Sequence, residues 1–112
     1  MRVLVANDPR CYREVMAAIL QEMRPRLEVL LGDPDDLRGE VERTEPHFLL
    51  CSRPNAMVDR VSSWAVLYPD GHGSAVVSIE GDSLVLESAD FEDVLEWVDR
   101  AAVALAGKSS ST

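Results

Sequence analysis

The chain carries little positive charge. Eleven arginine and lysine residues stand against twenty aspartate and glutamate residues, so the formal net charge is −9, and Lys108 is the only lysine. Because binding to nucleic-acid phosphates needs a basic surface, this balance argues against nucleic acid as a direct partner.

The chain also has few features of membrane or secreted proteins. No apolar run approaches the ~20 residues that cross a bilayer, and no basic-then-apolar signal segment is visible at the start. The only two cysteines, Cys11 and Cys51, lie far apart in sequence and cannot form a metal site by themselves. We therefore expect a cytoplasmic protein with no membrane association, no metal or other cofactor, and two free thiols, with Cys51 packed as a small hydrophobic residue.

With 112 residues, 46% of them hydrophobic and 28% charged, the chain has the composition of an ordinary globular protein and the length of one domain. A domain of this size buries roughly 60–70% of the surface of its unfolded chain, so one core can hold it without disulfides or metals. We expect a single domain over residues 1–107 and a flexible C-terminal tail over residues 108–112.

A short apolar run in the middle of the chain organises the predicted fold. Phe48-Leu49-Leu50-Cys51 has no polar alternation and is bounded by Pro46 on one side and by Ser52-Arg53-Pro54 on the other. Such a run is typical of a strand that is buried on both faces, as in the middle of a parallel sheet. In open α/β sheets functional groups gather just past the carboxyl ends of the central strands, which makes the position of Ser52 important.

Before this run the chain alternates between strand and helix patterns. Asp8 is predicted to cap a first helix, with Pro9 in its first turn. Asp33 followed by Pro34 predicts the start of a second helix. The alternation with short connections predicts a parallel sheet with right-handed crossovers. The predicted elements are strands at 3–6 and 27–31, helices at 12–23 and 33–45, and the buried strand at 48–51.

After residue 54 the pattern changes. Two β-rich segments flank Glu80-Gly81-Asp82, which predicts a hairpin turn and hence antiparallel strands at one edge of the sheet. Asp90 is predicted to cap a last helix, with Gly107 as its stop signal. The predicted segments are short helical turns at 55–61, a fourth strand at 64–68, hairpin strands at 75–79 and 83–86, and a helix at 90–106.

The order of these elements resembles the receiver domain of two-component response regulators. Residues 2–8 followed by Arg13-Glu14 resemble the family's first strand, acidic pair and first helix. Residues 45–52 resemble its third strand, and residues 87–95 resemble the entry to its last helix. Residues 55–83 fit poorly, because the hairpin stands where the family has a helix. The resemblance implies a flavodoxin-like three-layer α/β sandwich with a parallel central sheet in the order 2-1-3-4-5, here with an antiparallel hairpin at one edge.

The same resemblance implies a phosphorylation site whose residues this chain has replaced. In the family a histidine kinase phosphorylates an aspartate after the third strand, two acids after the first strand hold Mg²⁺, and a lysine after the fifth strand binds the phosphoryl oxygens. In this chain a serine stands at the position of the acceptor aspartate, and serine is not ionised at neutral pH. Only one carboxylate stands at the acidic pair, which makes a poor Mg²⁺ site, and a glutamate at the position of the lysine would repel a phosphoryl group. Conventional phosphorylation is therefore not expected. The matching positions carry Asn7 and Asp8 for the acidic pair, Ser52 for the acceptor and Glu87 for the lysine.

Several residues have a functional interpretation beside a structural one. Asp8 could be a relic of the metal site, but capping a helix is the commoner use of an aspartate there. Arg53 could bind a small anion beside Ser52, although a solvated loop arginine is more common. His47 begins a strand and His72 lies in a glycine-rich loop, so neither is evidently placed as a base. We assign no catalytic residue and do not expect an enzyme.

The first functional hypothesis is a non-catalytic, receiver-like signalling or regulatory module that acts through contacts with an unidentified protein partner. In the family the face formed by the fourth helix, the fifth strand and the last helix commonly carries dimerisation and output, and here the hairpin and the last helix would offer the equivalent surface. We therefore expect a homodimer through the hairpin and the helix at 90–106. Phe91 and Trp97 are the possible interface residues, if Trp97 proves to be exposed.

The second hypothesis is a small-ligand or anion sensor that uses the crevice at the C-terminal ends of the first and third strands. A weaker alternative is a thiol switch through Cys11 and Cys51, which this topology could bring near the same crevice. The crevice of the sensor hypothesis would be formed by Asn7, Asp8, Ser52 and Arg53.

Overall fold

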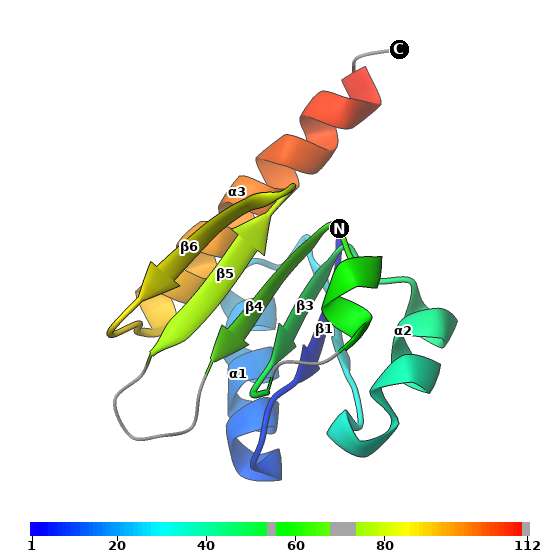
Figure 1. Ribbon diagram of the computed structural model, residues 1–112, viewed down its shortest axis with the longest axis vertical. Helices are drawn as coiled ribbons and strands as arrows, with labels where there is room; N and C mark the ends of the chain where they lie inside the picture. Colours follow the sequence, from blue (N-terminus) through cyan, green and yellow to red (C-terminus); the bar gives the residue numbers. More distant parts are fainter. Residues whose placement is uncertain (54–55, 68–73, 111–112) are drawn as a thin grey trace.

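The fold is an α/β architecture built on one six-stranded mixed sheet (Figure 1). The computed structural model describes residues 1–53, 56–67 and 74–110, with side chains as far as Gly107. The strand order is β2-β1-β3-β4-β5-β6. The strands are β1 (Arg2–Ala6), β2 (Glu28–Leu31), β3 (Phe48–Cys51), β4 (Ser63–Leu67), β5 (Ala75–Ile79) and β6 (Asp82–Leu86). The described helices are α1 (Arg10–Met23), α2 (Leu37–Thr44) and α3 (Phe91–Ser110), with the 3-10 helices η1 (Pro34–Asp36) and η2 (Ala56–Arg60).

β3 occupies the centre of the parallel part of the sheet. It pairs in parallel with β1 on one side and with β4 on the other. Its side chains alternate between the faces, so Phe48 and Leu50 join one core cluster and Leu49 joins the other. All four are buried, and Cys51 is the most exposed of them at 3%. The prediction of a strand at 48–51 that is buried on both faces is confirmed.

The two faces of the sheet carry different helices, as in a three-layer α/β sandwich (Figure 1). α1 and α3 cover one face, and α2 with η2 covers the other beside β1 and β3. On the second face Val41 and Val61 pack with Leu4 and Leu49. No helix within the described ranges combines the length and the apolar character needed to cross a bilayer. The helical residues buried in the larger cluster are Met16, Ala17, Leu20, Val94, Trp97, Val98 and Ala101.

The sheet is parallel only from β2 to β4. β5 runs antiparallel to β4, and β6 runs antiparallel to β5, so β6 points the same way as β4. Residues 68–74 link β4 to β5 and are too few for a parallel crossover, which needs about a dozen residues. The predicted antiparallel hairpin is confirmed, and the predicted parallel order 2-1-3-4-5 is matched only in part. Glu80 and Gly81 form the two-residue turn of the hairpin between β5 and β6. Their φ angles are positive, at 51° and 92°, as a type I′ turn requires.

The predicted cap of the first helix is wrong. α1 begins at Arg10, Pro9 occupies the cap position, and no side chain caps the helix. Asp8 stands one residue too early to cap it, and its carboxylate forms an ion pair with Arg53 instead.

The predicted end of the last helix is also wrong, whereas its start is confirmed. Asp90 Oδ1 accepts a hydrogen bond from the Asp93 amide at 3.0 Å, and the Asp90 amide donates to Asp93 Oδ2 at 2.9 Å. α3 then continues through Gly107 to Ser110. A helical glycine costs about 1 kcal/mol relative to alanine, which does not by itself end a helix. Most of the predicted tail at 108–112 is therefore helical, and residues 111–112 lie outside the described part.

An ion pair joins the end of α1 to α3. Arg24 donates from Nε to Asp99 Oδ1 at 2.8 Å and from Nη2 to Asp99 Oδ2 at 2.7 Å. Two parallel bonds fix the geometry better than one. The hydrogen bonds from Arg24 lower the pKa of Asp99. Because both side chains are partly exposed, the pair stabilises the fold only modestly.

Replacing Asp99 with asparagine should lower the free energy of unfolding by about 0.5–1 kcal/mol near neutral pH. The folded-state pKa of Asp99 is lowered, so its stabilisation is present above the unfolded carboxyl pKa of about 3.9 and is lost as the pH falls below it. Urea unfolding of wild type and D99N near pH 7 and at about pH 2.5 measures this loss. Glu14→Gln is the control, because its exposed pair with Arg10 lies within one helix. A difference between wild type and D99N that does not shrink at low pH would contradict the prediction.

A histidine aligns the first residues of β1 with the segment that enters β3. The Arg2 amide donates to His47 Nδ1 at 2.9 Å, and the His47 amide donates to the Arg2 carbonyl at 2.9 Å. Nδ1 must be unprotonated to accept this bond. Burial, followed by the charge of Arg2, lowers the pKa of His47. His47 therefore serves as a structural acceptor at the end of β3 opposite to Ser52.

His47→Asn should remove one component of the pH dependence of stability. Asparagine keeps an acceptor near the place of Nδ1 but does not titrate. As the pH falls below about 6.5, the unfolded wild-type chain binds a proton that the folded chain does not, so wild type should lose stability relative to H47N. Urea unfolding between about pH 8 and pH 5 measures the difference. Parallel stability profiles for the two proteins over this range would count against the lowered pKa.

Candidate functional site

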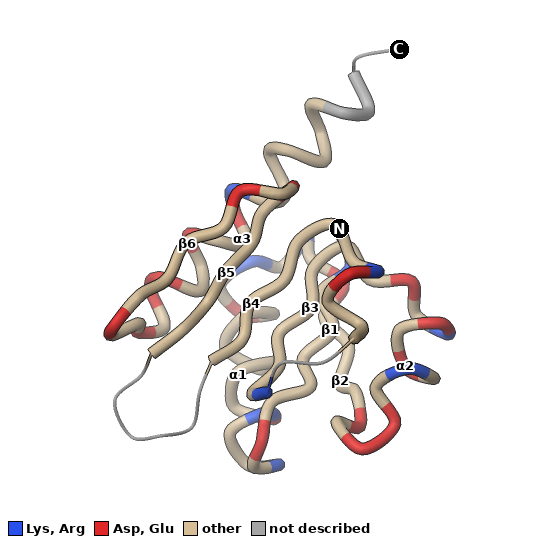
Figure 2. Tube along the Cα trace, in the orientation of Figure 1, with Lys and Arg blue, Asp and Glu red and all other residues tan. Residues whose placement is uncertain are grey.

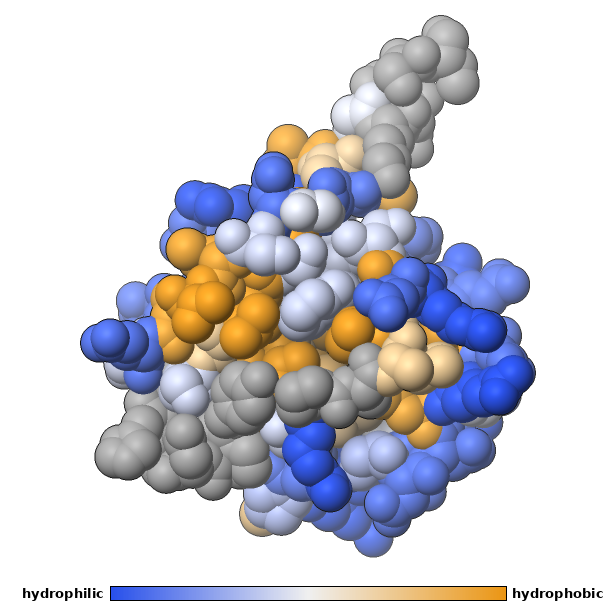
Figure 3. Space-filling model, in the orientation of Figure 1, coloured by the Kyte–Doolittle hydropathy of each residue, from blue (hydrophilic) through white to orange (hydrophobic). Residues whose placement is uncertain are grey.

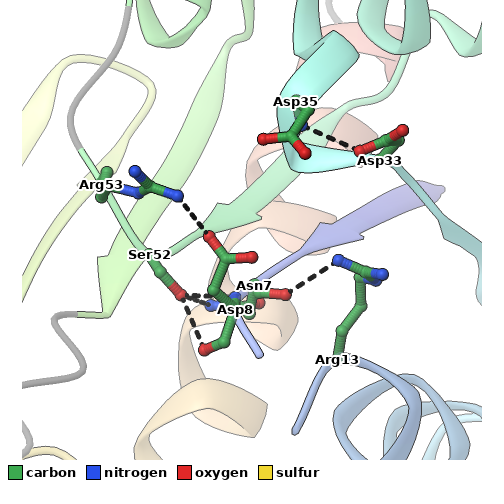
Figure 4. A network of polar contacts seen from close by, with 7 residues as sticks. All are labelled: Asn7, Asp8, Arg13, Asp33, Asp35, Ser52 and Arg53. Atoms are coloured by element: carbon green, nitrogen blue, oxygen red, sulfur yellow. Dashed lines mark hydrogen bonds and ion pairs between the residues drawn. The ribbon is translucent and has the colours of Figure 1, made fainter. Parts of the chain in front are cut away.

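The carboxyl ends of β1 and β3 carry the residues that the sequence singles out. Parallel pairing sets Ala6, the last residue of β1, beside Cys51, the last residue of β3. The residues that follow each strand therefore lie together at one edge of the sheet, as Figure 4 shows. The structure brings together Asn7, Asp8, Ser52 and Arg53.

Ser52 fastens these two strand ends to each other. Its Oγ accepts a hydrogen bond from the Asp8 amide at 2.9 Å and can donate to the Asp8 carbonyl at 3.4 Å. The Asn7 side-chain amide also donates to this Oγ at 3.4 Å. Ser52 is only 3% exposed. Its hydroxyl is thus an internal bridge between loops rather than a nucleophile presented to solvent.

Arg53 and Asp8 form an ion pair over this bridge (Figure 4). Arg53 Nη2 lies 2.9 Å from Asp8 Oδ2. The hydrogen bond to Asp8, and then the charge of Asp8, raise the pKa of Arg53. The arginine is largely exposed, so the pair adds little stability. The ion pair affects ligand binding more than stability. The Asp8 carboxylate that would attract a cation and the Arg53 guanidinium that would attract an anion neutralise each other.

Two hollows flank this group. A cavity of about 230 Å³ lies beside the ion pair, and a hollow of about 330 Å³ lies between the start of α1 and the end of β2. Both linings contain arginines and carboxylates, so neither selects an anion or a cation by charge alone. Ala6, Asp8, Pro34, Leu37, Cys51, Ser52 and Arg53 line the first, and Arg10, Arg13, Glu14, Leu31, Gly32 and Asp33 line the second.

Asn7 is buried beneath the ion pair. It has no exposed surface, and its Oδ1 finds no hydrogen-bond partner among the described residues. Arg13 Nη1 donates to the Asn7 carbonyl at 3.3 Å, which ties the first turn of α1 to the end of β1. A buried neutral amide thus stands where the receiver resemblance has an acid that holds Mg²⁺.

Glu87 does not join this group. It follows β6, which β4 and β5 separate from β3. At about 4.8 Å for each step between strands, β6 lies about 14 Å from β3. A side chain at this position is exposed at the far edge of the sheet, because β5 is inserted between β4 and β6.

Of the histidine and cysteine residues that the structure describes, Cys51 alone lines a cavity at the crevice. His47 lies at the opposite end of β3, and His72 lies outside the described residues. Cys51 is buried and its thiol points to the Ala65 carbonyl at 3.7 Å, whereas Cys11 is exposed on α1. Within residues 1–53, 56–67 and 74–110 no three His, Cys, Asp or Glu side chains group so as to hold a metal ion.

Trp97 is not exposed, although the expected aromatic interface requires it to be. Trp97 is only 3% exposed and packs in the core between the helices and the sheet, and Phe91 packs against the same cluster. The interface hypothesis required an exposed Trp97, so this condition is not met. Exposed apolar surface is found instead on β6, where Leu84 is 51% and Val85 is 73% exposed.

Sequence reasoning missed the polar contacts that close the crevice. The ion pair of Asp8 with Arg53 and the bond from Ser52 to the Asp8 amide join residues more than forty positions apart. The contact of Arg13 with the Asn7 carbonyl has no local sequence signal either. The available signal was topological, since residues that follow neighbouring parallel strands meet at one edge of the sheet.

The fold and the site together define an α/β protein with a mixed sheet, in which the polar side chains after β1 and β3 bind one another beside a cavity of about 230 Å³. Comparison of the chain with protein-family models, with curated proteins and with solved structures gives no match.

Replacing Ser52 with alanine should lower the free energy of unfolding by about 1–3 kcal/mol, because the Asp8 amide loses its acceptor in a partly buried place. Chemical denaturation measures the change. Ser62→Ala is the matched control, since the Ser62 side chain is exposed, and it should change stability by less than about 0.5 kcal/mol. Equal effects of the two substitutions would show that the Ser52 bridge does not stabilise the fold.

Proposed function

We propose that this chain is a non-catalytic regulatory module with a receiver-like, flavodoxin-like fold that acts through protein contacts. The supporting observation is that the polar groups after β1 and β3 are engaged with one another. Ser52 occupies the acceptor position, and its hydroxyl is engaged by the Asp8 backbone and by Asn7. A phosphoryl group transferred there would have to break these bonds without a carboxylate pair for Mg²⁺ or a nearby lysine.

The position of Glu87 adds to this argument. Stabilising the charge that develops on a transferred phosphoryl group requires a cation within a few ångströms of it. Glu87 is acidic and lies about 14 Å away by strand count, so neither its charge nor its place suits this role. The cation that does lie near Ser52 is Arg53, and it is paired with Asp8.

Incubation with acetyl phosphate and Mg²⁺ should leave the mass of the intact protein unchanged. Ser52→Asp should also remain unmodified, because it restores the acceptor but neither the second acid for Mg²⁺ nor the lysine. Intact mass spectrometry after rapid quenching is the readout, and a receiver domain that carries all the phosphorylation residues is the positive control. Stoichiometric phosphorylation of the wild-type chain would overturn the proposal.

A small-ligand or anion sensor is the second candidate. The cavity of about 230 Å³ beside Arg53 favours it. A thermal-shift screen with phosphate, nucleotides and divalent cations tests it, because a ligand that binds only the folded state raises its stability. Stabilisation by several degrees that Arg53→Ala abolishes would favour the sensor over the contact module.

A further inference from the structure

β6 forms one outer edge of the sheet, and β2 forms the other. β6 is the last strand in the order, and no described element pairs with its outer side. Proteins commonly protect such edges with lysine, proline or a bulge. β6 has the sequence Asp82-Ser83-Leu84-Val85-Leu86 and an unbroken register with β5, so it has none of these devices.

The hairpin register shows which backbone groups face outward. Ile79 and Asp82 close a two-residue turn, so they form a hydrogen-bonded pair, and the pairs alternate from there. The amide and carbonyl groups of Ser83 and Val85 therefore point away from β5. They offer donors and acceptors to a further strand.

An apolar row leads across the sheet to this edge. Val66 on β4, Val76 on β5 and Val85 on β6 are direct neighbours. Their exposure rises towards the edge, since Val66 is buried, Val76 is half-buried and Val85 is 73% exposed. Figure 3 shows hydrophobic surface over β5 and β6, on the face of the sheet that carries α2 and beside the region that α2 and η2 cover. On the opposite face Leu84 is 51% exposed, so an added strand would find apolar neighbours on both of its faces.

Carboxylates lie at both ends of this edge. Glu80 and Asp82 stand at the hairpin turn, and Glu87 follows the last residue of β6, as the red segments at both ends of β6 show in Figure 2. No arginine or lysine lies between residues 74 and 99. If two copies paired antiparallel about Leu84, Asp82 of one copy would stand opposite Leu86 of the other, and Glu87 would stand opposite Gly81, so acids of both copies would gather at each end of the joint. Juxtaposed like charges repel each other, so the edge disfavours a second copy.

We propose that β6 binds an extended segment of a partner protein by strand addition, and that this segment has an apolar centre and basic residues at both ends. The Ser83 and Val85 backbones would supply the hydrogen bonds, Leu84 and Val85 the apolar contacts, and the flanking acids the selectivity for positive charge. The inference names the partner surface of the proposed contact module and so rests on that proposed function.

Two synthetic peptides test the inference on the full chain. One is acetyl-Lys-Thr-Val-Leu-Val-Thr-Lys-amide, and the other has glutamate in place of both lysines. The lysine peptide should bind about tenfold more tightly than the glutamate peptide, because several cross-strand charge pairs change from attractive to repulsive. It should also slow the hydrogen exchange of the Ser83 and Val85 amides, as measured by NMR.

Variants separate the backbone contribution from the charge contribution. Val85→Pro removes an outward amide without removing a bond to β5 and should abolish binding of the lysine peptide. Val103→Ala is the matched control, because Val103 on α3 is equally exposed at 73%, and its binding should be unchanged. Asp82→Lys combined with Glu87→Lys leaves the backbone intact and should reverse the preference between the two peptides.

The inference is overturned if neither peptide binds, if both bind equally, or if binding leaves the Ser83 and Val85 amides unprotected. It is also overturned if light scattering shows a dimer whose Ser83 and Val85 amides are protected without peptide, since the occupant is then a second copy. Failure of peptide binding leaves the acetyl phosphate result untouched. Phosphorylation of the chain would remove the proposed function without altering the peptide result.

Discussion

The parallel register between β1 and β3 is the constraint on which the site depends. It sets Ala6 beside Cys51, so the chain leaves both strands at the same level of the sheet. Ser52 and Asp8 then meet within hydrogen-bond distance although they are far apart in sequence. The register itself is held by the burial of all four β3 side chains, because a slip of one residue would exchange the side chains of the two faces. His47 fixes the opposite end of the same strand pair through the Arg2 amide.

The side chains at the crevice bind one another, which limits the groups that could react there or hold a ligand. Arg53 covers the position after β3 with a positive charge, and Asp8 neutralises that charge. Through its small side chain Ser52 joins the chain segment after β3 to the segment after β1. A carboxylate at this position could not make the same connection and also remain exposed to a phosphoryl donor. The inserted strand β5 moves the end of β6 away from β3. The engagement of Ser52 by Asp8 and the distance of β6 from β3 both limit the chemistry available at this edge. The surface that we propose for partner binding, the edge of β6, lies away from this crevice.

The sequence predicts the parallel core well because its signals are local. The apolar run at 48–51 and the alternation before it predict a parallel core, and Asp90 correctly marks the start of α3. The hairpin is also predictable, since Glu80-Gly81 lies between two β-rich segments. The failures involve contacts or competition that local patterns do not encode. Asp8 has the residue type of a helix cap but stands one position too early and pairs with Arg53. Trp97 lies on the buried face of α3, which fills the space over β5, so it cannot supply an exposed interface.

Hydrogen exchange at the Asp8 amide tests the closed crevice most directly. Asp8 lies in the loop between β1 and α1, where an amide without an acceptor exchanges quickly. If Ser52 holds this loop, the Asp8 amide should exchange nearly as slowly as the amides of β1 in the wild-type protein and at the rate of an open loop in Ser52→Ala. Fast exchange of the Asp8 amide in the wild-type protein, with β1 fully protected, would contradict the account.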